Sequence, residues 1–183
     1  MGTIKTTNIE PIADNGTVTL GSSGDQFTLA TGAKSSFLYP AFEAKLSADQ
    51  AVSDVTTTKV QFDSEIFDTD NCYDNSTNYR FTPTVAGKYF VYSIVTGKDL
   101  GNDLLRVDTR IYKNGGGLYS NIIYVNTNSP GNMFGTPVYG IVDMNGSTDY
   151  LEIFAYLDYN GSSGVVDGSG DRVTYFGAYR IGS

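Results

Sequence analysis

The chain has 183 residues, a formal net charge of −8, no histidine and a single cysteine, Cys72. Its lysines and arginines are scattered singly, whereas phosphate backbones need clustered cations, so nucleic acid is excluded as a partner. Without histidine, the chain cannot build a Ser-His-Asp or Cys-His unit or a His-ligated zinc site, and without an apolar stretch of about 18 residues no membrane insertion is expected.

The first 36 residues are rich in Thr, Gly and Ser and only thinly apolar. The stretch GTVTLGSSGDQFTLATGA (16–33) holds two short alternating runs, Val18/Leu20 and Phe27/Leu29. A two-stranded hairpin of this kind is marginal in water by itself. It is a disordered tail, or it packs against the domain that follows or against other copies of the chain. The apolar residues available for such packing are Ile4, Ile9, Ile12, Val18, Leu20, Phe27 and Leu29. The segment MGTIKTTNIEPIADNG has no apolar core of a signal peptide, so we expect synthesis in a host cytoplasm without one.

From residue 37 the sequence becomes apolar and aromatic. Phe42 and Leu46 lie four residues apart, as in a helix over 41–54, yet Phe42, Ala44 and Leu46 also alternate as in a strand. Periodicity alone leaves these alternatives open for so short a run. Further along, residues 59–63 alternate, and GKYFVYSIVTG (87–97) is a nearly continuous apolar run, typical of a strand covered on both faces.

Two hairpins follow, with turns at Asn114-Gly115 and Asn145-Gly146. Their strands are expected near 104–113, 117–125, 137–144 and 149–158, and a last strand over 172–181. Both faces of the strand expected at 149–158 are apolar or aromatic, so both are expected to be buried. One face carries Leu151, Ile153, Ala155 and Leu157, and the other carries Tyr150, Phe154 and Tyr156 beside Glu152. About eight to ten short strands with regular turns predict a β-sandwich or a closed antiparallel sheet.

Several stretches resemble the C1q/tumour-necrosis-factor-like head. They are AFEAKLS (41–47), KVQFDSEIFDTDNCYDNSTNYRFTPTVAGKYFVYSIV (59–95), IYKNG (111–115) and YFGAYRI (175–181). The resemblance implies an all-β, ten-stranded jelly-roll sandwich over 37–183, with a strand at 41–47. It also implies a homotrimer, whose interface residues would be Tyr150, Phe154, Tyr156, Tyr175 and Tyr179.

The segment TVTLGSSGDQFTLATGA resembles the N-terminal parts of tailed-phage fibre proteins, in which strands of three chains wind into a β-rich stalk. Residues 1–36 are therefore expected to be an anchor or stalk, with three copies of each thin apolar stripe closing a small core. The signal peptide and collagen stalk typical of animal C1q proteins are not found in this sequence.

Chemistry-bearing residues are few. Cys72 lies among acidic residues, which raise the pKa of a thiol, and no phosphate-binding loop occurs. No cofactor is predicted. Asp68, Asp70 and Asp74 are candidate ligands for calcium, and the alternative for these residues is an ordinary solvated turn. A converging pair of carboxylates, as in a glycosidase, is not excluded by the sequence, but no catalytic residue is predicted.

The sequence thus predicts a non-enzymatic virion structural protein. It would be a homotrimeric phage surface fibre: a tail fibre or tip that binds a host receptor, or a capsid fibre or decoration protein. Its partners would be other virion proteins, through residues 1–36, and a glycan or protein of the host cell surface, at a site that the sequence does not identify. The alternative is a soluble C1q-like module, lectin-like or cytokine-like, that binds sugar or protein.

Overall fold

The computed structural model describes residues 38–99, 101, 103–125, 132–161 and 163–182. The predictions for residues 1–36, including the seven anchor residues, lie outside the described residues. Among the described residues, no helix is long and apolar enough to cross a membrane.

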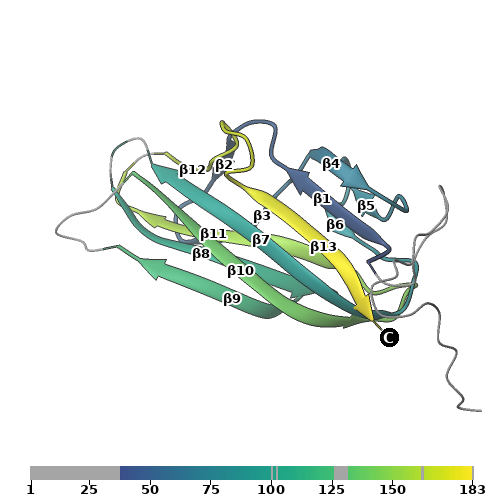
Figure 1. Cartoon of the computed structure of the whole chain (residues 1–183). Coiled ribbons are helices and arrows are strands. Elements are labelled where there is room, and N and C mark those ends of the chain that lie inside the picture. Colours follow the sequence, from purple (N-terminus) through teal and green to yellow (C-terminus); the bar gives the residue numbers. More distant parts are fainter. Residues whose placement is uncertain (1–37, 100, 102, 126–131, 162, 183) are drawn as a thin grey trace, which may run out of the picture. The chain divides into compact units, whose positions relative to one another are not determined.

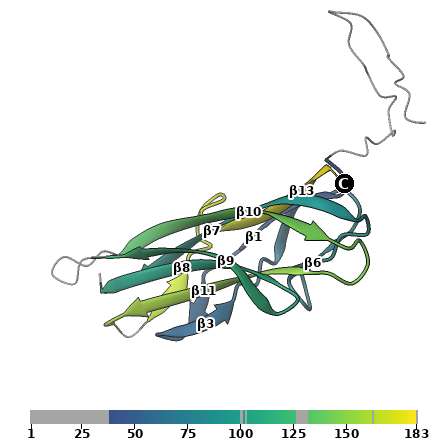
Figure 2. The same cartoon turned by 90° about the horizontal axis from the view of Figure 1, so that it is seen from below.

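The described residues form two antiparallel β-sheets that pack face to face as a sandwich (Figures 1 and 2). Sheet A contains β1 (Ala41–Lys45), β2 (Gln50–Val52), β4 (Ser64–Asp68), β7 (Gly87–Asp99), β10 (Met133–Met144), β12 (Gly164–Val166) and β13 (Tyr175–Gly182). Sheet B contains β3 (Thr56–Lys59), β5 (Tyr73–Asp74), β6 (Arg80–Phe81), β8 (Leu104–Lys113), β9 (Gly116–Tyr124) and β11 (Leu151–Tyr159).

The long strand β7 organises sheet A (Figure 1). It pairs with β10 along almost its whole length, from Gly87 opposite Met144 to Lys98 opposite Met133. Its other edge pairs first with β13 and then with β12. β13 in turn pairs with β1, and β1 with β4. In sheet B, β11 lies beside β8, and β9 forms the edge next to β8.

The core lies between the sheets because alternate residues of the strands point inward. On β11, Leu151, Ile153, Ala155 and Leu157 are fully buried, as their alternation predicts. At one end the core is aromatic: the Phe42 ring stacks on Tyr73 and Phe81, with centroids 4.7 and 4.5 Å apart, and meets Phe176 edge-on at 4.8 Å. Such ring pairs add to the free energy gained by burial alone.

The prediction of an all-β, two-sheet jelly-roll sandwich is confirmed, and residues 41–45 form a strand and not a helix. Thirteen strands occur among the described residues, more than the eight to ten expected, because five of them have only two to four residues and carry no periodicity. The strand expected over 59–63 is wrong. Residues 60–63 connect β3 to β4, and Val60 and Phe62 alternate because both are buried in the core from this connection.

Candidate interaction surfaces

The outer face of sheet A carries an aromatic surface that no described residue covers. Tyr139 of β10 is 67% exposed and Ile141 is 54% exposed. In the pairing of β10 with β7, Tyr139 lies opposite Tyr92 and Ile141 lies opposite Phe90. On the other edge of β7, Tyr179 of β13 lies opposite Phe90. The Phe90 ring lies 5.5 Å from Tyr179 and 6.3 Å from Tyr139. We call Phe90, Tyr92, Tyr139, Ile141, Tyr175 and Tyr179 the aromatic face.

A carboxylate lies within the aromatic face. Glu43 of β1 accepts a hydrogen bond from the Tyr92 hydroxyl at 2.9 Å and lies 3.3 Å from Arg172 Nε. Burial, and then the neighbouring Glu43 carboxylate, raise the pKa of Tyr92. Gly177 makes this arrangement possible, because a Cβ at that position would lie 2.4 Å from the Tyr92 ring and hydroxyl. The tyrosine ring therefore lies directly over the backbone of β13.

The outer face of sheet B carries a different surface, which we call the arginine cluster: Arg106, Asp108 and Arg110 with the rings of Tyr124 and Tyr156. Asp108 is fully buried and accepts hydrogen bonds from Arg106 Nε and Nη2, both at 2.7 Å, and from Arg110 Nη2 at 2.6 Å. Arg106 also lies over the Tyr156 and Tyr124 rings, at 4.5 and 5.1 Å from the centroids. The two guanidinium groups share the Asp108 carboxylate, and Asp158 of β11 lies opposite Arg106 in the strand pairing.

The five tyrosines and phenylalanines predicted for a trimer interface do not lie on one surface. Tyr175 and Tyr179 belong to the aromatic face of sheet A. Phe154 and Tyr156 lie on β11 of sheet B, and Tyr150 directly precedes this strand. Within the same chain, Tyr150 contacts Arg80, Phe154 contacts Tyr112, and Tyr156 contacts the two arginines of the arginine cluster. Their role between chains stays a prediction, and a single flat interface would contain only one of the two sets.

Sequence reasoning missed four members of the aromatic face: Phe90, Tyr92, Tyr139 and Ile141. A signal for two of them was present, because the apolar run 87–97 predicted cover on both sides of its strand. Tyr89, Val91, Ser93 and Val95 fill the inner side, which leaves Phe90 and Tyr92 on the outer side.

The three candidate calcium ligands serve as hydrogen-bond acceptors in turns. Asp68 accepts from the backbone N–H groups of Asp70 and Tyr73, and Asp70 accepts from the Thr69 hydroxyl. Asp74 accepts from the backbone N–H groups of residues 76, 77 and 78, first among them Thr77, and these bonds lower its pKa well below the ordinary value. Among the described residues, no group of three or more Cys, Asp and Glu is placed to hold a metal ion.

Cys72, which lies between Asp70 and Asp74 in the chain, is buried. Its Sγ lies 3.6 Å from the carbonyl oxygen of Asp70, and burial is the largest of the effects that raise its pKa. A thiol in this environment is a poor nucleophile, because the thiolate is the reactive form.

Comparison with known proteins shows the fold. No protein-family model matches the chain, and no curated protein sequence matches it. Crystal structures of murine APRIL at pH 5.0, pH 8.5 and pH 8.0 align with 77% of this chain and with 98%, 98% and 99% of their own chains. The TM-scores are 0.55, 0.53 and 0.53, at 12%, 14% and 14% sequence identity. This likeness identifies a jelly-roll sandwich of the tumour-necrosis-factor type.

Proposed function

We propose that this protein is a non-enzymatic structural head of a virion surface fibre, which assembles as a homotrimer through the aromatic face of sheet A. The observation that carries the proposal is the aromatic face itself. Six neighbouring side chains on three adjacent strands, two of them more than half exposed, form an apolar surface on the outside of the fold.

Burial of the aromatic face between chains would stabilise the complex that they form. Single exposed apolar residues are common on monomers, but contiguous apolar patches mark interaction sites. Each square ångström of apolar surface removed from water contributes about 25 cal/mol. Closed symmetry lets identical chains cover the same patch on one another, and the C1q/TNF-like resemblance favours three.

The placement on a virion is supported by the N-terminal sequence. Residues 1–36 resemble the segments with which phage fibre chains form a stalk, and the described head follows directly. Either a tail fibre tip or a capsid fibre would use the same arrangement, in which the head faces outward and Val18, Leu20, Phe27 and Leu29 pack between three chains.

The native mass tests the trimer. Light scattering of the full chain is expected to give three times 19.7 kDa. Ile141→Asp places a charge in the aromatic face and is expected to give a smaller assembly. Val55→Asp is the matched control, because Val55 is also 54% exposed but lies outside the aromatic face, in the turn before β3. A monomeric wild type, or an Ile141→Asp variant that keeps the wild-type mass, contradicts the proposal.

Incorporation into particles tests the anchor. The double variant Leu20→Asp/Phe27→Asp is expected to be lost from purified virions. The control Ser22→Asp/Ser23→Asp adds the same charge at polar positions and is expected to be retained. If both variants join virions as well as the wild type, the anchoring role of residues 1–36 is wrong.

A further inference from the structure

We infer that the hollow between β8 and β9 on the outer face of sheet B binds one sugar residue that carries a carboxylate. The ring of Tyr112 would receive the apolar face of the sugar, and the guanidinium of Arg110 would bind its carboxylate. The inference deepens the proposed function and rests on it for the source of the ligand, since a head displayed on a virion would meet acidic glycans on a cell surface.

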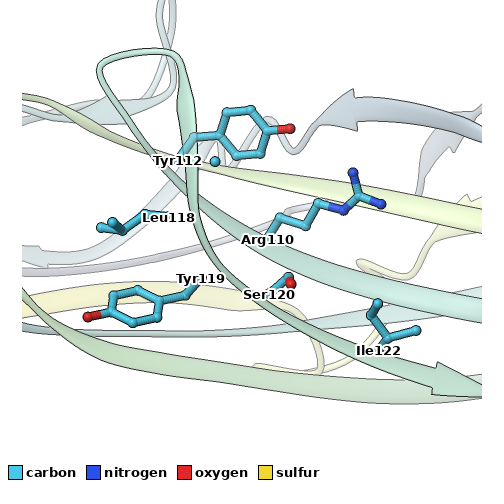
Figure 3. A pocket seen from close by; sticks show the side chains of 7 residues that line it. Arg110, Tyr112, Leu118, Tyr119, Ser120 and Ile122 are labelled. Atoms are coloured by element: carbon cyan, nitrogen blue, oxygen red, sulfur yellow. The ribbon is translucent and has the colours of Figure 1, made fainter.

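The hollow has the size of a small ligand. Its volume is about 290 Å³, and Figure 3 shows its lining along the two strands. Ligand pockets in proteins measure roughly 300 to 1,000 Å³, so this one suits a single ring and not an extended peptide. The lining residues include Arg110, Tyr112, Gly117, Leu118, Ser120 and Ile122.

Two small residues create the hollow. Gly117 lies opposite Tyr112 and Ser120 lies opposite Arg110 in the pairing of β9 with β8. A Cβ at position 117 would lie 3.7 Å from Cε2 and Cζ of Tyr112, so the glycine leaves this side of the ring uncovered. On β11, Phe154 packs against the same ring with centroids 4.2 Å apart and holds it in place.

Arg110 supplies a fixed positive charge at the hollow. Its Nη2 donates to Asp108 at 2.6 Å and its Nη1 to Thr57 Oγ1 at 3.1 Å. Burial acts to lower the pKa of Arg110, but the hydrogen bonds with Asp108 and Tyr112 outweigh it, and the group stays charged. A guanidinium has five N–H donors and a planar fork that matches a carboxylate.

Charge decides which kind of sugar fits. Among the residues that line the hollow, Arg110 alone carries a charge, and it shares the Asp108 carboxylate with Arg106. Because charge-assisted hydrogen bonds are about twice as strong as neutral ones, an acidic sugar is favoured over a neutral one of the same shape.

The test is a titration of the full chain with sodium glucuronate, monitored by NMR at constant ionic strength. Glucose is titrated in the same way as the neutral counterpart. Saturable binding of glucuronate is expected, at least about tenfold tighter than that of glucose, which corresponds to one charge-assisted contact. Gly117→Val would cover the Tyr112 ring and is expected to weaken glucuronate binding at least about tenfold. Gly116→Val, one residue away on the opposite side of β9, is the matched control and is expected to bind as the wild type does.

Arg110→Gln is a second variant, in which Asp108 keeps both bonds to Arg106, and it is expected to bind glucuronate no better than glucose. Absence of saturable glucuronate binding, equal binding of glucose, or unchanged binding by Gly117→Val would each overturn the inference. The native mass of the same samples tests the proposed trimer separately. A trimer that does not bind glucuronate contradicts only this inference, and a monomer that binds it contradicts only the proposed assembly.

Discussion

Asp108 shows how a single residue can fix a whole surface. Its side chain is fully buried and is the shared acceptor of Arg106 and Arg110, whose side chains are 21% and 24% exposed. Asp108→Asn would leave the two guanidinium groups without their counter-charge, and we expect a loss of about 3 kcal/mol in the free energy of unfolding, measured with urea. The control is Asp143→Asn at the exposed Lys88–Asp143 pair, where a loss below about 1 kcal/mol is expected. Equal losses would contradict the central role of Asp108.

Asp74 makes stability depend on pH. Backbone N–H groups of the turn, first Thr77 and then Ser76, hold its pKa below the unfolded value of about 3.9. A carboxylate with a lowered folded pKa contributes stability above the unfolded pKa, and this contribution is lost as the pH falls below about 4. Asp74→Asn is therefore expected to have a lower free energy of unfolding than the wild type at pH 7. The difference in free energy of unfolding between the two proteins is expected to shrink toward pH 3.

The measurement is the free energy of unfolding across that pH range. Asp171→Asn, at a side chain that is 99% exposed, is the control, and its difference from wild type is expected to be small throughout. A difference for Asp74→Asn that stays constant with pH would be the contrary result.

At the scale of elements, β7 depends on the absence of a side chain at Gly97. A Cβ there would lie 2.3 Å from Leu157 Cδ2 and 2.8 Å from Val107 Cγ2, both in sheet B. Gly97→Ala is expected to overpack the core and lower the free energy of unfolding by about 2 kcal/mol. Gly116→Ala on the edge strand β9 is the control, because its nearest atom, the Lys113 carbonyl oxygen, lies 3.5 Å from the added Cβ. The prediction is wrong if Gly97→Ala unfolds at the same urea concentration as this control.

At the scale of the whole molecule, the proposed assembly through the aromatic face would make stability depend on protein concentration. If folded chains bind one another and unfolded chains do not, the midpoint of thermal unfolding rises with protein concentration. We expect such a rise in calorimetry across about a hundredfold range of concentration, and little or none for Ile141→Asp. A wild-type midpoint that does not change with concentration would show that the aromatic face does not hold copies together.

The sequence by itself determined the fold class and much of the inner packing. Alternation in 149–158 predicted the buried side of β11, because inward side chains repeat every second residue in a strand. The same alternation misled at 59–63, since a connection that crosses the core can also bury every second side chain, here Val60 and Phe62.

Only the tertiary structure decided which outward residues share a surface. Tyr179 and Phe90 are neighbours because β13 pairs with β7, and Tyr156 lies under Arg106 because β11 pairs with β8. Strand order depends on contacts between residues far apart in the chain, and local periodicity carries no information about them. The sequence could therefore indicate single members of the aromatic face, such as Tyr175, Tyr179 and the outer side of 87–97, but not that they share one surface, and it did not predict the hollow over Tyr112.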